Sequence, residues 1–109
     1  MNNHQVDRER WSRMTIQEQM GNIGSEVDRS INEKRCGDDT RLKSAIDRAF
    51  DLFDATTELL VKNKSPRTKE VLRARDQFLS LFFNNTFDDA DNIEKYFMQY
   101  AIASRLSRG

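Results

Sequence analysis

Apolar residues recur three and four positions apart along most of the chain, and no stretch alternates cleanly between apolar and polar positions. A spacing of three and four places side chains on one face of an α-helix, so the pattern predicts an all-α protein. The chain contains a single proline, which leaves long helices uninterrupted.

Capping residues mark the ends of the first two predicted helices. The first helix begins at Thr15, where Thr15 and Glu18 match a capping box, and it stops at Gly37. The second helix starts near Asp39 or Thr40 and has the broadest apolar face of the chain. Each of these two helices is long enough to bury an apolar stripe.

Similar signals predict two further helices. Ser65 supplies an N-cap and Pro66 suits the first position of a third helix. Asp91 and Glu94 form a second box-like start for a fourth helix. Four helices with short connections favour an antiparallel up-down four-helix bundle over residues 13–109, preceded by a flexible segment of residues 1–12. The alternative is a three-helix domain with a swapped or docked fourth helix.

Two glycines lie inside the first predicted helix, in the stretch EQMGNIGSEVDRSI. A glycine in a helix interior costs about 1 kcal/mol relative to alanine, so a compensating reason is expected. Gly24 lies at the edge of the apolar stripe, and Gly21 lies beyond it near Ser25. Small residues at this spacing let another helix approach closely. That helix belongs either to the same chain or to another copy.

The fourth predicted helix carries apolar residues on two faces. Met98, Ile102 and Leu106 lie away from its main apolar stripe. A helix that is apolar on two faces is either central or covered by a partner. Together with the Gly21/Gly24/Ser25 flank, this outer face is the predicted contact surface, and it favours a homo-oligomer or another protein partner.

Arg75 is an unusual polar residue, because it falls inside the apolar stripe of the third predicted helix. A buried guanidinium needs a carboxylate partner, and Glu26 beside the stripe of the first helix is a candidate. We expect a buried ion pair that sets the register of the helices. Ligand binding by Arg75 is the alternative.

The strongest chemical candidate is a line of four acidic residues on the second predicted helix: Asp47, Asp51, Asp54 and Glu58. Such a line could chelate a divalent metal, but it points away from the apolar face and has lysines four residues before and after it. We therefore interpret it as a solvated face. No metal or other cofactor is expected.

Catalytic groups are scarce in this sequence. His4 is the only histidine and Cys36 the only cysteine, which excludes an internal disulfide and a cysteine-based zinc site. A serine or cysteine triad within a folded core would lack its histidine base. The sequence therefore predicts no catalytic residues and a protein that is not an enzyme.

Charge is balanced overall and uneven along the chain. Eighteen basic and eighteen acidic residues give a net charge of zero, so no global field attracts nucleic acid or anionic lipid. An antiparallel bundle nevertheless gathers basic residues at one end. This predicted basic pole could bind nucleic acid or an acidic protein surface, or could be a solvated surface without a ligand. Its residues are Lys62, Lys64, Arg67, Lys69, Arg105 and Arg108.

Four stretches of the sequence, WSRMTIQEQMGNIGSEVDRSI, DRAFDLFD, LRARDQF and IEKYFMQYAIASR, together resemble a family of short, uncharacterised bacterial all-helical proteins. The resemblance implies a bacterial origin and an all-helical fold, and it carries no information about catalysis. A looser, fold-level analogy connects the chain with the four-helix accessory proteins of reverse-transcriptase cassettes. Those are usually basic, whereas this chain is neutral.

We therefore expect a non-enzymatic helical-bundle module for protein–protein interaction or oligomerisation. The alternative is a nucleic-acid-binding accessory protein, such as a partner of a reverse transcriptase, that uses the basic pole. The longest apolar run is four residues and the first ten residues have no apolar core. These features predict a cytoplasmic protein without a membrane partner.

Overall fold

The computed structural model describes residues 6–84 and 87–108 of the 109-residue chain, apart from the side chains of residues 104, 107 and 108. Within these residues the chain is all-helical and has no strand. Four helices are long and two are short. In chain order they are α1 (Arg8–Ser12), α2 (Ile16–Cys36), α3 (Asp39–Lys62), α4 (Thr68–Phe83), the 3-10 helix η1 (Phe87–Asp89) and α5 (Ala90–Arg108).

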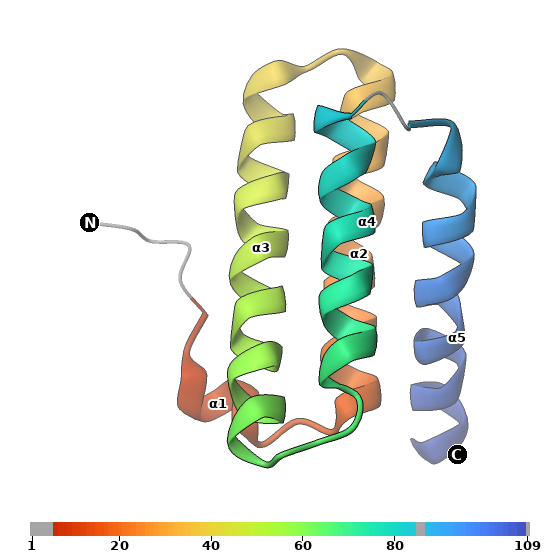
Figure 1. Ribbon diagram of the computed structural model, residues 1–109. Helices are drawn as coiled ribbons and strands as arrows, with labels where there is room; N and C mark the ends of the chain where they lie inside the picture. The colour runs from red at the N-terminus through yellow and green to blue at the C-terminus, as the bar shows by residue number, and fades with distance from the viewer. Residues whose placement is uncertain (1–5, 85–86, 109) are drawn as a thin grey trace.

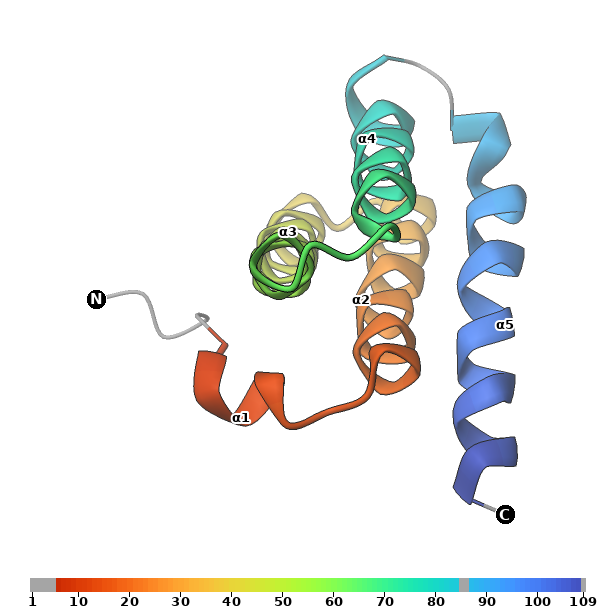
Figure 2. The same ribbon diagram turned by 60° about the horizontal axis from the view of Figure 1, so that its bottom comes forward.

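Each of the four long helices runs in the opposite direction to the one before it (Figure 1), and α5 is inclined to the other three (Figure 2). Helix α2 lies between α3 and α5, and α4 packs less extensively against α3 and α5 (Figure 2). Helix α1 and the connection from α3 to α4 share one end of the molecule. The end of α4 and the start of α5 lie at the opposite end.

The core forms where the apolar stripes of the four long helices meet. Helix α2 contributes fully buried residues from Met20 to Ile31 at helical spacing. The ring of Phe53 in α3 lies 5.9 Å from Phe78 of α4 and 6.0 Å from Phe97 of α5, measured between centroids. Aromatic pairs at this distance add to the free energy gained from burial of apolar area. The predicted apolar faces therefore supply the core, but Leu72 and Phe83, which the pattern assigned to the apolar face of α4, are exposed.

The ends of α2 confirm the capping predictions. Thr15 Oγ1 accepts a hydrogen bond from the Glu18 backbone N–H at 3.1 Å, and Glu18 Oε1 accepts one from the Thr15 N–H at 3.0 Å. Gly37 ends the helix with φ 78°, in the left-handed region that favours glycine. Asp38 then caps α3 by accepting a hydrogen bond from the Arg41 N–H at 3.0 Å.

Two predicted helix starts are wrong by a few residues. Helix α4 begins at Thr68, because Lys64 adopts a left-handed conformation with φ 52° and the chain makes a turn through Ser65 before the helix starts. Ser65 Oγ accepts from the Arg67 N–H at 3.2 Å within this turn, so it does not cap the helix. Helix α5 begins at Ala90, so Asp91 lies in its first turn.

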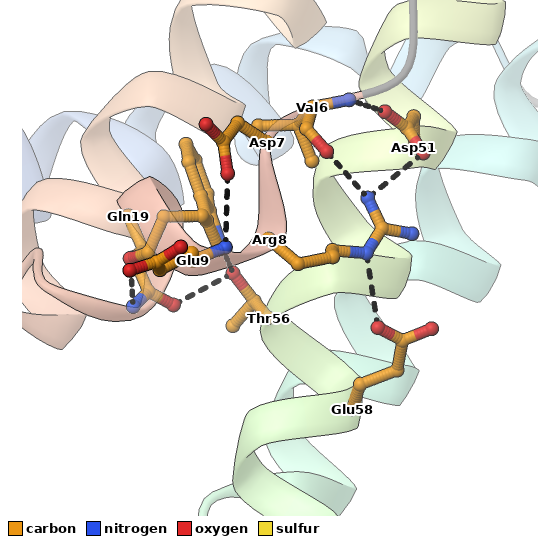
Figure 3. A network of polar contacts seen from close by, with 9 residues as sticks. Val6, Asp7, Arg8, Glu9, Gln19, Asp51, Thr56 and Glu58 are labelled. Carbon is orange, nitrogen blue, oxygen red and sulfur yellow. Dashed lines mark hydrogen bonds and ion pairs between the residues drawn. The ribbon is translucent and has the colours of Figure 1, made fainter.

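The N-terminal segment also differs from the expectation of a flexible stretch over residues 1–12. Residues 1–5 lie outside the described part, but α1 is held against the bundle. Trp11 is buried, and its Nε1 donates to Thr56 Oγ1 at 2.9 Å. Thr56 donates in turn to Gln19 Oε1 at 2.9 Å (Figure 3). The single tryptophan belongs to the core, which makes α1 part of the folded domain.

Candidate interaction surfaces

The glycine flank of α2 is covered by α5 of the same chain. A Cβ atom added to Gly24 would lie 2.8 Å from Phe97 Cβ, and one added to Gly21 would lie 3.9 Å from Ala101 Cα. Gly24 is therefore required for the close approach of α5, which is the intramolecular alternative. Of the predicted flank only Ser25 is exposed, so the flank is not available to a second copy.

The outer face of α5 is exposed. Met98, Ile102 and Leu106 have exposed fractions of 59%, 50% and 77% and follow one another at a spacing of four residues. The opposite side of the helix buries Phe97 and Tyr100 against the core. An apolar row on the surface of a helix whose other face is already packed is typical of an interaction site.

Hydrogen bonds in a polar cluster also join α5 to α4, and the sequence did not predict this cluster. The hydroxyls of Tyr96 and Tyr100 donate to the same Glu70 oxygen at 2.7 and 2.5 Å, and the two hydroxyl oxygens lie 3.2 Å apart. The helical pattern assigns both tyrosines to the apolar stripe of α5. No feature of the sequence around Glu70 indicates that this carboxylate has a special partner. Their meeting depends on how α4 and α5 pack.

This cluster shifts the proton equilibria of its members. Hydrogen bonds from Tyr100 and Tyr96 hold the pKa of the Glu70 carboxyl below its ordinary value. Burial, followed by the hydrogen bond to Tyr100 and the contact with Glu70, raises the pKa of Tyr96. Burial likewise raises the pKa of Tyr100, and its hydrogen bond to Glu70 adds to that effect. At neutral pH the arrangement is therefore a carboxylate with two neutral phenols.

Four members of the predicted basic pole belong to the end of α3, the α3–α4 connection and the start of α4, whereas Arg105 belongs to the C-terminal part of α5, which lies apart from that connection (Figure 2). Five of its members are exposed, and none of the five forms an ion pair with a described residue. The side chain of Arg108 lies outside the described residues. Unpaired surface cations of this kind can displace counterions from a polyanion. The five residues are Lys62, Lys64, Arg67, Lys69 and Arg105.

Arg75 does not form the expected buried ion pair with Glu26. Its side chain is 32% exposed, and its Nε lies 3.4 Å from Asp54 Oδ1. The guanidinium also stacks on Phe50, 4.9 Å from the ring centroid. A long arginine stem can cover apolar surface while its head stays in contact with water, which explains an arginine within an apolar stripe.

The line of acidic residues on α3 is used by ion pairs. Asp47 pairs with Lys43 at 3.0 Å. Arg8 of α1 bridges Asp51 at 3.1 Å and Glu58 at 3.0 Å (Figure 3). In the described part of the chain, no group of three or more histidine, cysteine or acidic side chains is arranged to hold a metal ion. The line therefore helps to dock α1.

No protein-family model, curated protein or solved structure matches this chain. Among the helices of the described residues, none combines the length and apolar content needed to cross a membrane.

Proposed function

We propose that this chain is a non-enzymatic interaction module, an antiparallel up-down four-helix bundle that associates with copies of itself through the outer face of α5. The observation that carries the proposal is the exposed row of Met98, Ile102 and Leu106 on a helix whose inner face is already packed. Burying one such side chain fully gains about 1.5–3 kcal/mol, so the row is the largest source of association energy on this helix.

The size of this face limits the strength of association. Two proteins lose an estimated 4–15 kcal/mol of translational and rotational free energy on binding, and stable interfaces bury about 1,200–2,000 Å². Three partly exposed side chains on one helix offer less than that. We therefore expect an assembly that depends on protein concentration and that recruits polar residues beside the row.

The test is light scattering after size-exclusion chromatography across a range of protein concentrations. The variant carries Met98→Gln, Ile102→Gln and Leu106→Gln together. We expect the wild-type protein to exceed the mass of one chain at high concentration, and the variant to elute as a monomer of unchanged helicity. Val61→Gln is the matched control, because Val61 is 58% exposed on a different helix. A wild-type protein that stays monomeric, or a variant that still assembles, would refute the proposal.

A second candidate is a nucleic-acid-binding accessory protein, by analogy with the helical partners of reverse transcriptases. The four exposed basic residues around the α3–α4 connection, without ion pairs to described residues, favour it over a uniformly charged surface. The zero net charge of the chain weakens it. Binding would come from phosphate contacts and would fall steeply with salt.

Fluorescence anisotropy with a labelled single-stranded RNA and DNA, measured at several salt concentrations, tests this candidate. Lys64→Glu, Arg67→Glu and Lys69→Glu together should abolish binding. Lys34→Glu with Lys95→Glu is the charge control, because both lysines are exposed elsewhere. Equal binding by both variants, or none by the wild-type protein at low salt, would eliminate the candidate.

A further inference from the structure

A cleft with a volume of about 290 Å³ lies between α2 and the first half of α3, away from the outer face of α5 and from the basic pole. Three of the residues that line it are arginines, one from α2 and two from α3, and a serine hydroxyl stands among them. Its lining residues are Arg29, Glu33, Arg41, Ser44, Ala45 and Arg48.

The three guanidinium groups are only loosely bound by the protein. Arg29 and Arg48 approach one oxygen of Glu26 at 3.7 and 3.9 Å, and Arg41 approaches Asp38 at 3.6 Å. These separations exceed hydrogen-bonding distance. An arginine carries five N–H donors, and no hydrogen bond joins these three side chains to another described residue. Their donors remain available to a bound group.

Glu26 supports two of these arginines from the interior side. Its side chain is 13% exposed, and its second carboxylate oxygen, Oε2, is buried without a hydrogen-bond partner in the described structure. A buried carboxylate is costly unless cations lie close to it. Glu26 therefore holds Arg29 and Arg48 near each other at the cleft without occupying their outward donors.

The donors that line the cleft suit an anion, although Glu26 and Asp38 offset part of the charge of the three arginines. Three lining residues are cationic and one, Glu33, is acidic. Arg41 lies in the first turn of α3, where the helix dipole contributes positive potential that the Asp38 cap and Asp39 partly offset. Guanidinium groups match phosphate oxygens with paired N–H donors, and a serine hydroxyl adds a further hydrogen bond.

We propose that this cleft binds the phosphate group of a small ligand, with Arg29, Arg41 and Arg48 as its cationic contacts. Its volume is at the lower end for ligand pockets, which fits a phosphate or a small phosphomonoester. The inference is independent of the proposed function, because neither the α5 face nor the basic pole contributes a residue to the cleft.

Isothermal titration of the full chain with inorganic phosphate, and separately with pyrophosphate and a nucleoside monophosphate, tests the site. Sodium chloride at matched ionic strength is the blank. We expect saturable binding at one site per chain, weakened about tenfold by Arg41→Gln and by Arg48→Gln. Tighter binding of the monophosphate than of inorganic phosphate would identify an organic phosphate as the ligand, and the reverse would identify free phosphate.

Two controls keep the result clear. Arg67→Gln removes a cation of the basic pole and should leave phosphate binding unchanged. Arg48→Gln also removes a cation beside Glu26, whose Oε2 is buried, so thermal melts accompany the titrations. If Arg48→Gln does not fold, the Arg41→Gln variant alone tests the site. Absence of saturable binding by the wild-type protein, or equal affinity in Arg41→Gln, would overturn the proposal. Loss of phosphate binding in Arg67→Gln would show that phosphate binds at the basic pole, and this result would also overturn the proposal.

Discussion

The two glycines of α2 lead to opposite predictions for the same substitution. In Gly21→Ala, the new methyl group meets Ala101 Cα at 3.9 Å, an ordinary van der Waals contact. In Gly24→Ala, it meets Phe97 Cβ at 2.8 Å and Phe97 Cγ at 3.3 Å. Cβ is fixed to the backbone, so rotation of the phenyl ring cannot relieve this contact and α5 has to move.

The expected free energies follow from these distances. Alanine is favoured over glycine in a helix interior by about 0.5–1 kcal/mol, and Gly21→Ala should stabilise the fold by that amount. Gly24→Ala gains the same term but incurs the cost of overpacking, which is about 1–3 kcal/mol. We expect a net loss of up to about 2 kcal/mol. In a domain of this size, 1 kcal/mol corresponds to about 4–8 °C in melting temperature.

Urea and thermal unfolding followed by far-UV circular dichroism measure both variants against the wild-type protein. Light scattering at the same concentration ensures that the three proteins are compared in one oligomeric state. The reasoning fails if Gly24→Ala is as stable as Gly21→Ala, because α5 would then not cross α2 at this position. A loss of stability in Gly21→Ala would equally contradict the contact distance at that site.

Three further predictions concern side-chain contacts. Trp11→Phe removes the N–H donor to Thr56 and should lower the free energy of unfolding by about 1–3 kcal/mol in urea. Glu70 has a lowered folded-state pKa, so its contribution to stability is present above its unfolded pKa of about 4.3 and is lost as the pH falls through the lower folded-state value. Glu70→Gln should flatten that part of the stability–pH curve. Arg75→Gln should cost no more than about 1 kcal/mol, because the pair with Asp54 is partly exposed.

Each of these has a clear opposing result. Unchanged stability of Trp11→Phe would mean that α1 is not held by the indole hydrogen bond. A wild-type protein whose acid unfolding matches that of Glu70→Gln would show that the carboxylate gains nothing from the two phenols. A loss of about 3–5 kcal/mol in the free energy of unfolding of Arg75→Gln would instead support the buried ion pair that the sequence predicted.

The sequence alone determined the features that depend on neighbouring residues. The all-helical class, the capping box at Thr15 and Glu18 and the stop at Gly37 were all predicted from residues within a few positions of each other. Hydrophobic periodicity and capping act within one or two helical turns, so these predictions need no knowledge of packing. The exposed outer face of α5 was also predicted, because it follows from the helical period. Helix α1 was missed, since five residues are too few to show that period.

Tertiary structure decided which distant residues meet. It brought Phe97 onto Gly24, paired Arg75 with Asp54 and joined Glu70 to two tyrosines of α5. It also gathered Arg29 of α2 with two arginines of α3 around one cleft, although nothing in either helix distinguishes those residues. Such contacts depend on the rotation and axial shift of one helix against another. Those two quantities are set by the packing of the whole core, and no short stretch of sequence contains them.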